Sequence, residues 1–168
     1  MVDIRAERCT GELDGDFVVF LIGMRINRWW RVHKWLPIAR AMGDMLAELA
    51  RQPELGLLHA RPHIGFPNLM FVQYWRSFAQ LEAYATARDK SHLPAWSAFN
   101  RAIANNGDVG IWHETYVIGA GDSESFYVNM PPFGLGAAGT LAPAKGRRAN
   151  ARGRLSAAGA GQSEGDAS

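Results

Sequence analysis

Cysteine is almost absent from this chain, which has Cys9 and no other among its 168 residues. A single cysteine excludes an internal disulfide and a zinc site built from several cysteines, and it fits a reducing compartment. Long apolar runs are also missing, because the longest, FVVFLIGM, is far shorter than the ~20 residues that cross a bilayer. The polar start, MVDIRAERCTGELDGD, does not look like a secretory signal. These absences predict a soluble, cytoplasmic protein without a membrane partner.

The common motifs of nucleotide and hydrolytic sites are missing too. No GxGxxG follows an expected strand and no GxxxxGK[ST] is present, which argues against Rossmann and P-loop sites. No GxSxG or HExxH occurs, so serine-hydrolase and zinc-protease chemistry have no support. Any catalytic site must be built from other combinations of residues.

Charge is scarce in the body of the chain and concentrated in its tail. The net charge is +2, but residues 137–168 hold five Lys/Arg and two acidic residues, whereas residues 1–136 hold thirteen and fourteen. A body of charge −1 offers no basic footprint, so we expect no nucleic-acid partner. The tail from 139 to 168 is rich in Ala, Gly, Arg and Ser, and its low apolar bulk predicts disorder.

Hydrophobic patterning predicts an α+β domain at residues 15–120. The order is strand, helix, strand, strand, helix, strand, over residues 16–26, 34–51, 55–65, 69–76, 77–105 and 109–118. Ser77 and Gln80 form a capping box, Pro37 suits a first turn, and Pro62 suits an edge strand. This order is typical of a ferredoxin-like βαββαβ antiparallel sheet with both helices on one face. Residues 1–14 are an N-terminal segment, and 121–138, with Pro131, Pro132 and several glycines, an ordered irregular extension.

The expected sheet has a second face that no helix covers. Both side-chain sets of its strands are largely apolar, as in DFVVFLIGMRI. An exposed apolar face of this size indicates a partner surface. Two copies packed face to face would make a homodimer, a dimeric α/β barrel with a shared interior.

Four residues around one expected helix and strand are the first candidates for chemistry. His92, Trp96 and Asn100 are spaced by four, which puts them on one helical face and would point them into a pocket. Alternatively, Pro94 interrupts the helix and leaves His92 in a loop. His113 lies mid-strand in GIWHETYVI and is either a satisfied core residue or a general base or metal ligand.

Aromatic and cationic residues on the strands are candidates for substrate binding. Trp75, Tyr74 and Arg25 could line a small-molecule pocket, although each alone is more often structural. Residues 129–133 could form a lid that brings Phe133 to the substrate. His59 and His63 lie on one side of a strand but have no third ligand nearby, so we predict no metal site. The stretch NRWWRVHKW is amphipathic surface, or alternatively a contact for a membrane or a partner.

Six ordered blocks resemble a known family: DGDFVVFLIGMRIN, VHKWLP, VQYWRSFAQLEAYA, HLPAWSAFN, GDVGIWHETY and NMPPFGLG. Over about residues 10–137 they are similar to a bacterial and fungal monooxygenase-like family, the DUF4188 group. That family looks like a branch of the dimeric α+β barrel superfamily, which includes cofactor-free antibiotic-biosynthesis monooxygenases. The resemblance implies a homodimeric monooxygenase acting on a small, electron-rich organic substrate of secondary-metabolite type.

The resemblance leaves the chemistry open among three alternatives. Without a cofactor, His113 or His92 would deprotonate the substrate, O₂ would accept its electron, and Asn100, Trp75 or Arg25 would bind the oxygen anion. The same architecture hosts haem enzymes such as aldoxime dehydratases, so a histidine could instead bind a non-covalent haem. The third alternative is a non-catalytic domain that binds a small ligand.

Overall fold

The computed structural model of this chain describes residues 3–87, 97 and 106–159. The chain divides into two compact units, one made of Phe20–Thr115 and the other of Met1–Val19 together with Tyr116–Ser168. The first unit falls inside the predicted core domain, 15–120. The second joins both ends of the chain, which the sequence analysis treated as separate segments.

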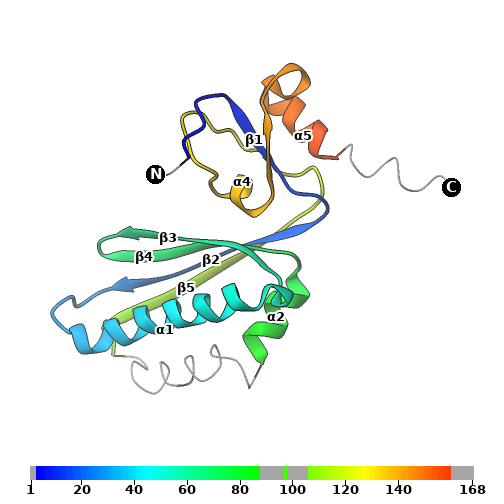
Figure 1. The fold of residues 1–168 in the computed structure, drawn as a ribbon. Coiled ribbons are helices and arrows are strands. Elements are labelled where there is room, and N and C mark those ends of the chain that lie inside the picture. The colour runs from blue at the N-terminus through cyan, green and yellow to red at the C-terminus, as the bar shows by residue number, and fades with distance from the viewer. Residues whose placement is uncertain (1–2, 88–96, 98–105, 160–168) are drawn as a thin grey trace. The chain divides into compact units, whose positions relative to one another are not determined.

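The first unit contains most of a four-stranded sheet, whose strand order is β3-β4-β2-β5 (Figure 1). Its strands are β2 (Phe17–Ile26), β3 (Leu57–Gly65), β4 (Asn68–Trp75) and β5 (Val109–Ile118). Sequence neighbours β3 and β4 form an antiparallel hairpin, whereas β2 lies between β4 and β5. This is the strand order of a ferredoxin-like fold, so the predicted fold class is confirmed. Pro62 lies in the edge strand β3, as its missing N–H requires.

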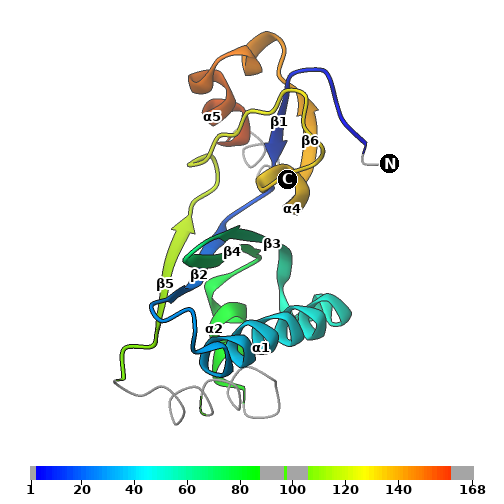
Figure 2. The ribbon, with the colours of Figure 1, turned by 90° about the vertical axis from the view of Figure 1, so that its left-hand side faces the viewer.

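Helices α1 (Val32–Arg51) and α2 (Phe78–Thr86) lie on one side of this sheet (Figure 2). The start of α1 corrects the prediction, because the helix begins two residues before position 34 and Pro37 lies beyond its first turn. The start of α2 agrees with its prediction: Ser77 Oγ accepts a hydrogen bond from the Gln80 backbone N–H at 3.2 Å. A short 3₁₀ helix, η1 (Pro53–Leu55), precedes β3. The rest of the predicted second helix, 88–96 and 98–105, lies outside the described residues.

The core between α1 and the sheet identifies the side of each strand that faces the helices. Met24, Ile26 and Val109 form a buried cluster, against which α1 and two strands pack through Trp35, Ile38, Ala39, Leu69 and Ile111. Alternate residues of a strand point to the same face, so these residues define the helix-facing side of β2, β4 and β5. The residues between them define the other side, here called the outer face.

The outer face is less apolar than the sequence analysis predicted. Trp112 lies there over Gly23, since an added Cβ at Gly23 would come within 2.8 Å of the indole ring. Alternation and the β3–β4 register put apolar and polar residues side by side on this face: Leu21, Arg25, His59, Arg61, His63, Met70, Val72, Tyr74 and Glu114. The expectation of a continuous apolar face is therefore wrong in part, because the polar positions of β3 fall on this side.

The second unit pairs the two ends of the chain. Strands β1 (Cys9–Glu12) and β6 (Thr140–Pro143) form an antiparallel ladder. Around them lie α4 (Leu135–Ala138), η2 (Gly146–Ala149) and α5 (Ala151–Gly159). Residues 121–138 are irregular apart from isolated bridges and α4.

The predicted disorder of 139–168 is wrong over residues 140–159. Composition alone suggested too little apolar bulk, but β6 takes its hydrogen bonds from β1, far away in sequence. Arg154 is largely buried, and its guanidinium contacts Glu124 at 2.7 Å and lies over the Phe126 ring. The arginines that suggested a solvated tail thus form specific ion pairs, as Arg148 also does with Glu12. Residues 160–168 lie outside the described residues.

Candidate functional site

His113 lies near the middle of β5 on the helix-facing side of the sheet. Val109 and Ile111, four and two residues earlier, belong to the core under α1, and alternation puts His113 on the same side. Its ring is tilted against that of Phe20 from β2, with centroids 5.6 Å apart. The side chain is exposed rather than enclosed. An accessible imidazole beside an aromatic ring can bind a flat substrate and exchange a proton with it.

The predicted catalytic residues His92 and Asn100 and the predicted substrate-binding residue Trp96 all lie outside the described residues. Their common helical face stays a prediction.

Trp75 is a core residue. It is 1% exposed, its ring packs on Tyr84 of α2 with centroids 5.9 Å apart, and its indole N–H donates to Gln73 Oε1 at 2.8 Å. The only polar hydrogen of this side chain is therefore already bonded, which leaves none for an oxygen anion. The two side chains meet because Gln73 and Trp75 are neighbours on one face of the same strand.

Arg25 and Tyr74 lie on the outer face, away from His113. Arg25 sits between the core residues Met24 and Ile26, and Tyr74 is the register partner of His59 in β3. Arg25 and Tyr74 therefore point to the opposite side of the sheet from His113, because a strand directs adjacent side chains to opposite faces. Their predicted role in substrate binding stays a prediction.

Phe133 belongs to the second unit. It is half-buried there, and its carbonyl accepts a hydrogen bond from Gly136 N–H at 3.0 Å in the turn before α4. Its predicted contact with substrate stays a prediction.

His59 has an unusual environment on the outer face. Its ring lies 6.5 Å from that of Tyr74, and its Nε2 atom is buried without a hydrogen-bond partner. Burial, and then the nearby Arg61 charge, lower the pKa of His59. The imidazole is therefore neutral over a wider pH range than usual. Among the described residues, no three His, Cys, Asp or Glu side chains lie close enough together to hold a metal ion.

A carboxylate–phenol pair beneath the sheet was not anticipated. The Tyr84 hydroxyl of α2 donates to Glu48 Oε2 of α1 at 3.0 Å. Burial, and then the Glu48 carboxylate, raise the pKa of Tyr84 well above its ordinary value. The Tyr84 hydroxyl therefore keeps its proton and donates it in the hydrogen bond to Glu48. The inward position of Tyr84 was readable from helical periodicity, but nothing in the sequence indicated its partner on the other helix.

Comparisons with known proteins cover most of this chain. Residues 17–135 match the model of the family described as Monooxygenase af470-like. Monooxygenase af470 of Aspergillus fumigatus is 31% identical over 132 residues, which are 73% of this chain and 46% of that protein. The chain thus spans about half the length of the curated relative that it matches.

Solved structures with a similar arrangement are much more distant in sequence. SnoaB, a cofactor-independent oxygenase from Streptomyces nogalater, is 13% identical with a TM-score of 0.44, over 60% of this chain and 91% of that one. A dimeric ferredoxin-like protein of unknown function from Jannaschia sp. CCS1 is 20% identical with a TM-score of 0.42, over 58% and 97%. At such values these likenesses add nothing to the family match.

Proposed function

Because the chain belongs to the Monooxygenase af470-like family, we propose that it uses O₂ to oxidise a small, electron-rich organic substrate. The reaction takes place on the helix-facing side of the sheet, and the substrate is an enolisable or phenolic compound of secondary-metabolite type. The observation that carries this proposal is the exposed imidazole of His113 beside the Phe20 ring.

In the proposed reaction His113 is the general base. Its neutral imidazole removes a proton from an activated CH₂ group, and the resulting carbanion passes one electron to O₂. The two radicals combine into a carbon–oxygen bond, and the resulting peroxide anion takes up the proton held by His113 to give a hydroperoxide. Loss of water with the second C–H hydrogen leaves a ketone, so CH₂ and O₂ become C=O and H₂O. The substrate supplies all four electrons, and the Phe20 ring offers it a flat apolar contact.

Oxygen uptake with a panel of anthrones, phenols and enolisable ketones tests this proposal. We expect His113→Ala to lower turnover by about 10²–10⁴-fold, the usual contribution of a general base. His33→Ala, at an exposed position of α1, is the matched control and should leave turnover unchanged. Labelled ¹⁸O₂ should place one labelled atom in the product. Unchanged turnover in His113→Ala would refute the base, and label arriving from water would refute the reaction.

We propose that this reaction needs no cofactor, since the substrate itself reduces O₂. The competing alternative is a non-covalent haem bound by one of the histidines. An absorbance spectrum of the purified active protein separates the two, because haem gives an intense Soret band. Full activity in colourless protein supports the cofactor-free reaction, and activity that follows a Soret band refutes it.

We further propose that two copies of this chain form a homodimer through the outer face. Trp112, which lies over Gly23, shares this face with Val72 and Tyr74, so aromatic and aliphatic side chains are present there, and exposed apolar patches mark partner surfaces. Sedimentation equilibrium should give twice the mass of the chain. Trp112→Arg should shift the equilibrium to monomer, whereas the exposed Trp30→Arg should not. A wild-type monomer at high concentration would refute the dimer.

A further inference from the structure

Two tryptophans stand at the tip of a tight turn between β2 and α1. Arg31 N–H donates to the Arg28 carbonyl at 3.1 Å, which closes a four-residue turn with Trp29 and Trp30 at its two central positions. These side chains are 61% and 60% exposed. Their rings meet edge to face, with centroids 6.1 Å apart and an interplanar angle of 86°. Most of the surface of both indoles is therefore exposed to solvent.

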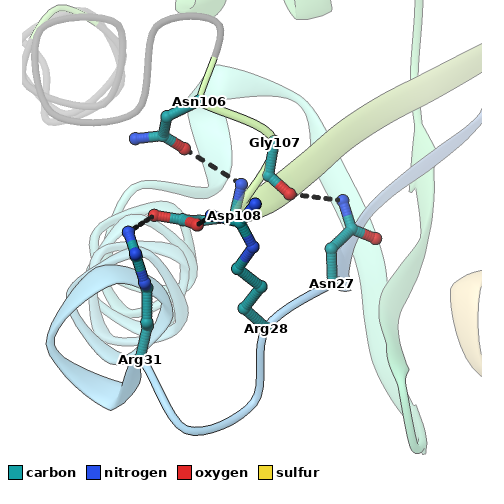
Figure 3. A network of polar contacts seen from close by, with 6 residues as sticks. All are labelled: Asn27, Arg28, Arg31, Asn106, Gly107 and Asp108. Carbon is teal, nitrogen blue, oxygen red and sulfur yellow. Dashed lines mark hydrogen bonds and ion pairs between the residues drawn. The ribbon is translucent and has the colours of Figure 1, made fainter.

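The turn is fixed by contacts at both of its ends. Asp108, which is 0% exposed, accepts hydrogen bonds from Arg28 and Arg31, each at 2.9 Å (Figure 3). The Asp108 carbonyl also accepts from the backbone N–H of Arg28 at 3.2 Å, and the Trp35 indole donates to the Trp29 carbonyl at 3.0 Å. The two exposed indoles thus project from a turn that is held before any partner binds. This limits the conformational entropy that binding would cost.

The sequence on both sides of the turn carries positive charge and no acidic residue. Residues 17–43 contain no Asp or Glu but hold five cations: Arg25, Arg28, Arg31, Lys34 and Arg40. The first turn of α1 has no acidic residue, so the partial positive charge of the helix N-terminus is not offset there. Asp108 neutralises one of the two guanidinium charges beside the tryptophans. The remaining charge favours an anionic partner.

We propose that the turn Arg28–Arg31 docks the protein on the surface of an anionic lipid membrane. Indole rings favour the boundary between headgroups and hydrocarbon, and flanking arginines attract anionic lipids. Two exposed indole rings at the tip of a turn can insert among lipid headgroups without a complementary binding pocket. Single-stranded nucleic acid is the less suitable occupant, because rings at 86° do not form parallel stacking platforms. No helix among the described residues could cross a bilayer, so the contact is peripheral. This proposal revises the expectation of no membrane partner.

Vesicle flotation with the full chain tests the proposal. Wild-type protein should float with vesicles of phosphatidylcholine and phosphatidylglycerol, should bind phosphatidylcholine alone weakly, and should be released as the salt concentration rises. The double variant Trp29→Ser/Trp30→Ser should weaken binding to anionic vesicles by at least about tenfold. The control Ile64→Ser, at a position that is 81% exposed, should bind like wild type.

Two further measurements keep the test decisive. Circular dichroism checks that the double variant is folded, and brominated lipids should quench wild-type tryptophan fluorescence, which requires no variant. The proposal is overturned if wild type does not float, if the double variant floats equally well, or if no quenching occurs. It is also overturned if a fluorescent single-stranded oligonucleotide binds through Trp29 and Trp30 while vesicles do not.

Discussion

The buried pair Trp75 and Gln73 gives the most quantitative prediction. Trp75 is 1% exposed and Gln73 is 4% exposed, and their side chains share a hydrogen bond of 2.8 Å. The substitution Trp75→Phe keeps an aromatic ring on Tyr84 but removes the donor. Gln73 Oε1 then loses this donor in a site from which water is largely excluded.

Two costs add up in Trp75→Phe. Removing the donor to a buried polar group costs about 1–3 kcal/mol. The smaller ring leaves a cavity of roughly 40 Å³, which at ~24 cal/mol per Å³ costs about 1 kcal/mol. The unfolding free energy should therefore fall by about 2–4 kcal/mol. The companion variant Gln73→Leu strands the indole N–H instead, at about 1–3 kcal/mol. In the double variant neither polar group of the pair remains.

Urea unfolding followed by circular dichroism measures these differences. The double variant should be more stable than the sum of the two single losses predicts, with a coupling energy of about 1–2 kcal/mol. Trp30→Phe, at a position that is 60% exposed, is the control and should change stability by less than about 0.5 kcal/mol. Losses that simply add, within about 0.3–0.5 kcal/mol, would refute the reasoning, since the two side chains would then stabilise the fold independently.

Three further predictions concern other parts of the first unit. Gly23→Val should lower stability by about 1–3 kcal/mol, because its Cβ would come within 2.8 Å of the Trp112 ring; a thermal melt that matches wild type would contradict this contact. Ser77→Ala should cost about 1 kcal/mol, since it removes the hydrogen bond to Gln80 N–H, and urea unfolding beside the exposed Thr86→Ala measures it. Because burial lowers the pKa of His59, the unfolded chain binds a proton first as the pH falls below about 6.5. Unfolding free energy should therefore decline there, and melts of His59→Asn between pH 8 and 5 should lack this contribution.

The fold could be predicted because its signals are local. Apolar periodicity located α1, the capping pair at Ser77 located the start of α2, and Pro62 indicated the edge position of β3. Each of these signals depends on neighbours within a few residues. The second unit could not be predicted for the opposite reason. Strand β6 forms because it pairs with β1 from the other end of the chain. The amino-acid composition of residues 139–168 does not predict that pairing.

The candidate site depends less on local signals than the fold does. Strand alternation indicates which residues of one strand share a face. It does not indicate which of these faces lie on the same side of the sheet when several strands are combined. Arg25 was proposed to bind the oxygen anion formed by a base such as His113, yet the packing of Met24 and Ile26 under α1 puts Arg25 on the outer face. Hydrogen-bond partners that are distant in sequence, such as Glu48 for Tyr84, could not be predicted either. Tertiary packing decides these relations.

The division of the sheet into two faces has a consequence for the proposed chemistry. His113 and Phe20 lie on the helix-facing side, whereas Trp112 and Tyr74 lie on the outer face proposed for dimerisation. A substitution that only separates the two copies need not remove the base from its substrate. Trp112→Arg should therefore reduce the dimer more than the turnover per chain, and His113→Ala should do the reverse. If both variants lost turnover and dimer together, the two faces would be coupled, and the site would have to include the interface.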